Sequence, residues 1–164
     1  MDASKFQELS ERTQNGLVVL DDEMKLGAVN YVLGLIGEYG ELVSADKLEE
    51  GYLGELGDVW WYFSAIHSVF GLRLVDTMNE VMELGACDGD ALLLLSGLSE
   101  MAKKFAFHGK GYDAGELQDN LIDLGCLILG LTPAGVWLGS VWEGNVEKLK
   151  ARYPEGFVIG GGVR

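Results

Sequence analysis

Apolar residues recur every three or four positions along most of this chain, the spacing that gathers them on one side of an α-helix. The spacing predicts helices over 4–13, 28–47, 53–70, 77–84, 91–107, 113–131 and 133–152. Glycine or proline stands at several of the breaks, including Gly51, Gly71 and Pro133. The apolar stretch 16–20 is ambiguous between strand and loop, and no longer strand pattern occurs. The pattern therefore predicts an all-α protein.

The chain has 164 residues, of which 48% are hydrophobic, and this is enough for the core of one domain. We expect a single helical domain over 1–164. A weak internal similarity, with an offset of about 64 residues, relates 28–84 to 91–152. It pairs Glu55 with Asn120 and Asp58 with Asp123. Unrelated helices also show such similarity by chance, so both interpretations remain: two fused, degenerate halves or a chance match.

Four carboxylates stand on the apolar sides of two neighbouring predicted helices. Glu38 and Glu41 are three residues apart in the first, and Glu55 and Asp58 are three apart in the second. Residues at this spacing share one face of a helix. Leucine, valine and tyrosine residues occupy the same two faces. We therefore expect the four acids to point toward the core and toward one another.

Carboxylates on a core-facing side repel one another and are costly to bury without a partner. A hard divalent cation removes that repulsion, and oxygen ligands suit Mg²⁺ or Mn²⁺. Either acid pair alone is common on a solvated helix face. Two pairs on apolar faces, separated by one short turn, instead predict a metal site.

The net charge of the chain is −14 and its pI is about 4.4. This acidity argues against nucleic-acid binding, which needs a basic surface. The stretch 124–142 carries no charge and is long enough to cross a bilayer. Thr132, Pro133 and four glycines interrupt it, so we expect helix ends joined by a turn and no membrane span.

The two cysteines, Cys87 and Cys126, form no C-x-x-C motif. Separate cysteines favour a reducing compartment without a disulfide framework. The start of the chain is amphipathic and charged, unlike a signal peptide. We expect a cytoplasmic protein.

The acid pattern resembles a known enzyme family. Gly37-Glu38-x-x-Glu41, followed by Glu55-Leu-Gly-Asp58-Val-Trp-Trp-Tyr, is similar to the E-x-x-E and E-x-x-D motifs of the MazG-like nucleoside triphosphate pyrophosphohydrolases. The stretch 145–157 also resembles the end of many small, often phage-encoded members. The resemblance covers about 28–157. The chain departs from the family at Gly37, where members often carry a second Glu, and in the helical unit between the acids and the tail.

The resemblance implies an all-α MazG-like helical bundle that binds Mg²⁺ or Mn²⁺ through Glu38, Glu41, Glu55 and Asp58. It implies hydrolysis of a nucleoside or deoxynucleoside triphosphate to the monophosphate and pyrophosphate. A water activated by the metal or by a carboxylate, with Glu38 and Glu41 as catalytic residues, would attack the α-phosphorus.

The resemblance also implies contacts to the substrate. Asn145, Lys148 and Arg152 match tail positions that approach phosphates in relatives. Lys104 and Lys110 are further candidates for phosphate, and Trp61 is a candidate for the base. The base itself stays open: dGTP is our choice, with dUTP and dCTP as alternatives. Members usually build their sites between paired subunits, which implies a homodimer or homotetramer.

Two other functions compete with this one. A di-iron carboxylate bundle needs Glu-x-x-His pairs, and neither His67 nor His108 completes one. A non-catalytic helical assembly protein with a vestigial metal site is the second alternative, and the intact set of four acids argues against it.

Overall fold

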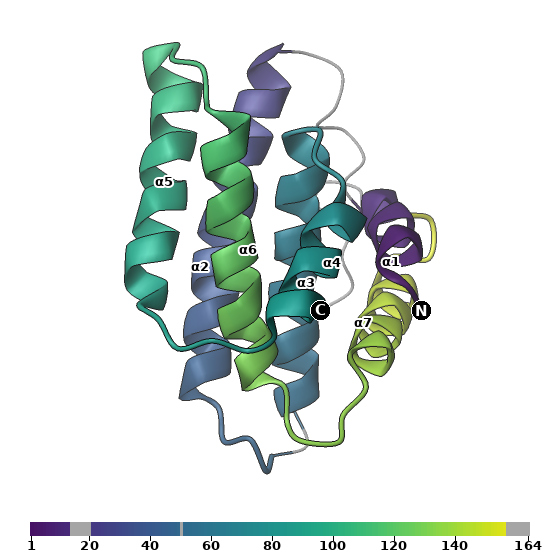
Figure 1. Cartoon of the computed structure of the whole chain (residues 1–164). Coiled ribbons are helices and arrows are strands. Elements are labelled where there is room, and N and C mark those ends of the chain that lie inside the picture. Colours follow the sequence, from purple (N-terminus) through teal and green to yellow (C-terminus); the bar gives the residue numbers. More distant parts are fainter. Residues whose placement is uncertain (14–20, 50, 157–164) are drawn as a thin grey trace.

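The computed structural model describes residues 1–13, 21–49 and 51–156. This part of the chain is helical, as the sequence pattern predicts, and the all-α class is confirmed (Figure 1). The elements are α1 (Ala3–Ser10), the 3₁₀ helix η1 (Glu11–Thr13), α2 (Asp21–Ser44), α3 (Tyr52–Val69), α4 (Leu74–Leu84), α5 (Ala91–His108), α6 (Ala114–Leu131) and α7 (Leu138–Arg152).

The helices pack as two hairpins that exchange their third helix. Helices α2 and α3 form one hairpin, α5 and α6 form the other, and α2 packs against α5 (Figure 1). The helix that follows each hairpin packs on the opposite one, α4 on α6 and α7 on α3. Helix α1 contacts α3, α4 and α7. The predicted units 28–84 and 91–152 correspond to α2–α4 and α5–α7, while the sequence repeat itself stays a prediction.

Helix α3 lies at the centre of the core because other helices cover it on several sides. Its middle is apolar nearly all round, as expected for an enclosed helix. The ring of Trp60 meets Phe63 edge to face at 5.1 Å and Trp142 of α7 at 6.1 Å. Phe6 of α1 stacks on Trp142 at 5.0 Å. These aromatic contacts join α1, α3 and α7 into one packed unit.

A buried polar chain links α3 to α4 and α6. His67 hydrogen-bonds through Nδ1 to the Phe63 carbonyl at 2.8 Å and through Nε2 to Thr77 Oγ1 at 2.7 Å. Gln118 Nε2 donates to the same hydroxyl at 2.7 Å. Burial lowers the pKa of His67 to about 4, so the imidazole is neutral at physiological pH and fits this interior without a counter-charge.

Several predicted helix ends were wrong. Helix α2 begins at Asp21 rather than 28, and α4 begins at Leu74 rather than 77. The last helix begins at Leu138 rather than 133, because the segment after Pro133 forms a turn. The Val136 amide donates to the Pro133 carbonyl at 3.1 Å, and Gly135 has a positive φ of 83°, which an α-helix does not accept.

The charge-free stretch 124–142 is divided between the end of α6, this turn and the start of α7. No described helix has both the length and the apolar composition needed to cross a membrane. The ambiguous stretch 16–20 and the tail 157–164 lie outside the described residues.

A substitution at Gly125 tests the close packing of α6 on α4. A Cβ at this position would lie 2.7 Å from Cγ2 of the buried Val81. Gly125→Ala should therefore lower the free energy of unfolding by about 1–3 kcal/mol through overpacking. In the control, Gly144→Ala in α7, nothing lies within 4 Å of the added Cβ, and alanine favours the helix by about 1 kcal/mol. Thermal unfolding should show a lower Tm for the first variant alone, and equal Tm values would contradict this contact.

Candidate metal centre

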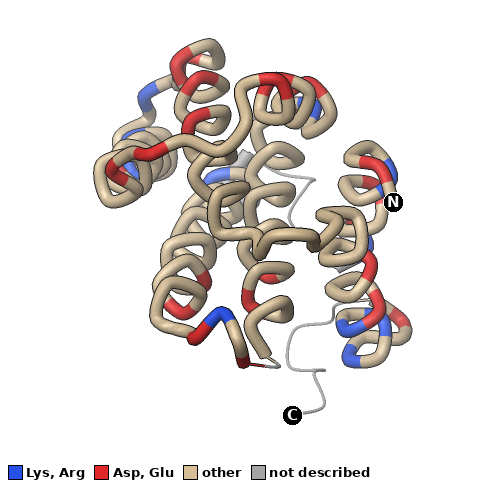
Figure 2. Tube along the Cα trace, turned by 60° about the horizontal axis from the view of Figure 1, so that its bottom comes forward, with Lys and Arg blue, Asp and Glu red and all other residues tan. Residues whose placement is uncertain are grey.

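Acidic residues occur at many separate places along the trace, so acidity by itself does not mark a site (Figure 2). One group of acids differs from the rest because its carboxylate oxygens lie close together. Glu38 of α2 and Glu55 and Asp58 of α3 each offer a carboxylate oxygen, and these oxygens lie within 4.8 Å of one another. All three residues are half-buried. Among the described residues, they form the one cluster of acids, histidines or cysteines with the geometry to hold a metal ion.

Helix α7 brings two nitrogen donors to this cluster. Asn145 Nδ2 donates to Asp58 Oδ1 at 2.7 Å, and Lys148 Nζ donates to Asp58 Oδ2. Both oxygens of one acid are therefore bound from α7. Asn145 is 3% exposed, and its Oδ1 is buried without a hydrogen-bond partner.

Gly57 allows α7 to come this close. A Cβ on Gly57 would lie 2.9 Å from the Cβ of Asn145. A larger residue at position 57 would push Asn145 away from Asp58, which follows Gly57 in the sequence. The bare backbone at Gly57 therefore sets the distance between the acids of α3 and the amide and ammonium of α7.

The surroundings of Glu38 favour its protonated form. Burial raises the pKa of Glu38 to about 7, with further increases from Asp58, Glu41 and Glu55 and an opposing effect of Lys148. A carboxyl group in this environment is poised between its two protonation states near neutral pH. An added cation would remove the conflict by stabilising the charged form.

The aromatic ring of Tyr62 lies beside the acids, and Trp61 packs against this ring. The ring of Tyr62 covers Gly34, where a Cβ would lie 2.1 Å from Tyr62 Cε1. Burial raises the pKa of Tyr62, and Glu38, Asp58 and Tyr153 raise it further, so its phenol stays neutral next to the carboxylates. Trp61 is half-buried and meets Tyr62 edge to face at 4.8 Å and Tyr31 at 5.9 Å.

Not every candidate residue joins this cluster. Glu41 is exposed and lies outside the group of three, although its charge is close enough to affect Glu38. Arg152 is exposed at the end of α7, with its guanidinium 5.5 Å from the centre of the Tyr153 ring. Lys110 is exposed in the connection between α5 and α6.

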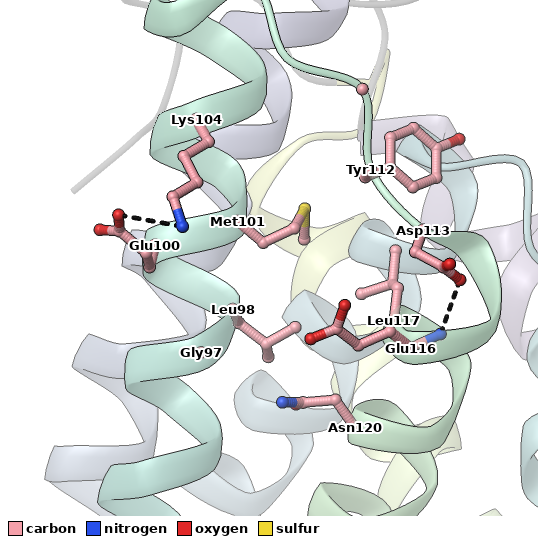
Figure 3. A pocket seen from close by; sticks show the side chains of 11 residues that line it. Gly97, Leu98, Glu100, Met101, Lys104, Tyr112, Asp113, Glu116, Leu117 and Asn120 are labelled. Atoms are coloured by element: carbon pink, nitrogen blue, oxygen red, sulfur yellow. Dashed lines mark hydrogen bonds and ion pairs between the residues drawn. The ribbon is translucent and has the colours of Figure 1, made fainter.

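Lys104 lies at a different cavity, between α5 and α6, of about 290 Å³ (Figure 3). Its Nζ is 3.4 Å from Glu100 Oε1. Leu98 and Met101 of α5 point toward α6, and Asn120 of α6 points toward α5 (Figure 3). The repeat offset places Met101 and Asn120 where the first hairpin has Glu38 and Glu55. At these two positions the second hairpin therefore has a thioether and an amide in place of carboxylates.

The contact between Gly57 and Asn145 and the contact between Gly34 and Tyr62 were not predicted as pairs. The sequence did hold a signal for them. Glycines cluster around the acids within two predicted helices, although glycine lowers the stability of a helix. That signal indicates close approach without naming the approaching side chain.

Comparisons of the chain with protein-family models, curated proteins and solved structures found no match.

The pKa of Glu38 predicts how stability depends on pH when divalent cations are removed. The usual value is 4.5 and the folded value is about 7. Stability gained from protonation is therefore complete below the usual value and is lost as pH rises through the folded value. In a chelating buffer, Tm should fall between about pH 5 and about pH 8, and Glu38→Gln should flatten this decline. Added Mn²⁺ at the alkaline end should raise the wild-type Tm.

The control for this measurement is Glu83→Gln on the exposed side of α4, which should keep the wild-type pH profile. An unchanged profile in Glu38→Gln would show that Glu38 does not lie among unfavourable charges. No effect of Mn²⁺ on wild-type Tm would argue against a metal at this cluster.

Proposed function

We propose that this chain hydrolyses a nucleoside or deoxynucleoside triphosphate to the monophosphate and pyrophosphate, with Mg²⁺ or Mn²⁺. The observation that carries the proposal is the meeting of three half-buried carboxylates with a lysine and an asparagine of α7. A metal-bound triphosphate needs this combination, because carboxylates hold the ion and an ammonium group neutralises phosphate oxygens. The choice of the bond between the α- and β-phosphates rests on the resemblance to the MazG-like enzymes.

The donor set suits a hard cation. Glu38, Glu55 and Asp58 offer oxygen ligands from two helices, and small side-chain rotations would bring these oxygens to one ion. When bound, Mg²⁺ or Mn²⁺ supplies positive charge to the triphosphate and lowers the pKa of a coordinated water. The unpartnered Oδ1 of Asn145 is a further oxygen close to Asp58.

Lys148 has two partners in this proposal. Without substrate it neutralises Asp58, and its side chain is 44% exposed, so it is free to turn outward. A cation at the carboxylates would replace it as the counter-charge of Asp58. The ammonium group then becomes available for a phosphate oxygen, while the buried Asn145 keeps Asp58 in position.

Glu38 is one candidate to accept a proton from the attacking water, and a bound cation would keep it in the charged form that a base requires. Glu41, one turn further along α2, is the second candidate for this role. Tyr62 provides apolar ring surface next to the acids and Trp61 packs edge to face on it, so we propose this pair for stacking of a base. We propose dGTP as the substrate, with dUTP and dCTP as rivals to be separated by a panel of deoxynucleotides.

Removal of single acids tests the catalytic proposal. Asp58→Asn and Glu38→Gln should each lower kcat/KM by on the order of 100-fold or more while the fold persists, because each removes a charge that holds the metal. Asp123→Asn in α6, the position that the repeat offset matches to Asp58, is the control and should keep activity. Product analysis should detect monophosphate and pyrophosphate. Diphosphate and inorganic phosphate would refute the proposed bond, and a wild type inactive on every triphosphate would favour the non-catalytic alternative.

Lys148→Ala tests the phosphate contact. It should raise KM by about tenfold, the effect of losing one charge-assisted hydrogen bond. Lys150→Ala is a matched control on the same helix, since Lys150 pairs with Glu147 at 2.7 Å and has no described contact to the acids. Equal KM values for the two variants would remove Lys148 from the substrate site and leave it as a structural partner of Asp58.

A further inference from the structure

The fold brings the two cysteines together. Cys87 lies in the connection between α4 and α5, and Cys126 lies in the second half of α6. The Cys87 thiol donates a weak hydrogen bond of 3.9 Å to the carbonyl oxygen of Asp123. Asp123 precedes Cys126 by three residues, so its carbonyl points along the helix toward the turn that carries Cys126. The thiol of Cys87 is therefore held one helical turn or less from its counterpart.

The connection is held against α6 on both sides of Cys126. A Cβ on Gly89 would lie 3.3 Å from Cδ2 of Leu127, and a Cβ on Gly130 would lie 4.0 Å from the Cys87 carbonyl oxygen. Segment 87–89 therefore lies against the side of α6 that carries Asp123, Leu127 and Gly130. This contact keeps the two sulfur atoms near each other in the folded chain.

The two thiols differ in accessibility. Cys87 is exposed, whereas Cys126 is 2% exposed. A hollow of about 380 Å³, lined by Cys87, Leu127 and Leu131 among others, opens beside the exposed thiol. Burial, followed by the neighbouring thiol of Cys87, raises the pKa of Cys126. An oxidant from solution therefore meets Cys87 first, and Cys126 is placed to react second.

We propose that Cys87 and Cys126 are a thiol modification site that closes into an intramolecular disulfide on reaction with a small disulfide compound. The Cys87 thiolate attacks one sulfur of the compound, forms a mixed disulfide and releases one thiolate. The Cys126 thiolate then attacks the Cys87 sulfur and releases the second thiolate. Two protein thiols lose two protons and two electrons, and the small disulfide is reduced to two thiols.

The bond would tie the connection after α4 to the second half of α6. The loop that it closes contains all of α5 and the part of α6 that precedes Cys126. Closing a loop of this size restricts the unfolded chain and stabilises the folded one. Oxidation would therefore make the second hairpin harder to open, and this effect is independent of the proposed hydrolase.

The test uses the full chain with bis(2-hydroxyethyl) disulfide, a small neutral reagent that the negative protein does not repel. Wild type should lose both free thiols and the mass of two hydrogen atoms, and peptide mapping should find the Cys87 peptide linked to the Cys126 peptide. The protein should keep the size that it has before oxidation. Its Tm should rise by several degrees and return after reduction with dithiothreitol.

Two variants serve as controls. Cys87→Ser should keep a protected Cys126 thiol and an unchanged Tm, because the thiol that reacts first is missing. Cys126→Ser should stop at the mixed disulfide on Cys87, and Cys126→Ala serves if the serine variant unfolds. The proposal is overturned if wild type retains the mixed disulfide on Cys87 with Cys126 free, or if the product is a dimer joined through two Cys87 residues. The peptide map of wild type decides this even where a variant fails to fold.

Discussion

The close approach of α7 to α3 at Gly57 is the contact on which the candidate site depends. Packing and electrostatics meet at this point, because Asn145 is held against Gly57 and bonded to the neighbouring Asp58. A wider separation of the two helices would take Asn145 and Lys148 away from the carboxylates together. The aromatic contacts of Trp142 with Phe6 and Trp60 anchor the same helix one turn earlier. The position of the ammonium group is therefore a consequence of core packing.

The candidate site is electrostatically unfavourable without a bound cation. Three partly buried acids repel one another, and one lysine and the protonation of Glu38 relieve part of this repulsion. The second hairpin shows the alternative arrangement, with Leu98, Met101 and Asn120 at its cavity. Glu100, Asp113 and Glu116 also line this cavity, but among the described residues they do not converge closely enough to hold an ion. Acids that converge at a cost in stability are typical of a functional site.

The sequence predicts the helices and the convergence of Glu38, Glu55 and Asp58, because both depend on local spacing. Glu41 shows the limit of that reasoning. Three residues along a helix leave side chains roughly 60° apart around the axis, and only the packing of α2 against α3 decides that Glu38 faces the acids of α3 while Glu41 reaches solvent. The start of α7 was mispredicted because proline is favoured both in helix first turns and in the turns that precede helices. The partners of Asp58 come from a distant helix, and for them the sequence supplied a family resemblance in place of a physical rule.

The exchange of third helices has a consequence for the growing chain. Asp58 is made 87 residues before Asn145 and 90 residues before Lys148. During synthesis the first hairpin therefore emerges with its acids exposed and without the helix that covers them. Helix α4 likewise emerges before α6, the hairpin element on which it packs. Neither half can bury its own core alone, so the chain is expected to fold as one cooperative unit after α7 has left the ribosome.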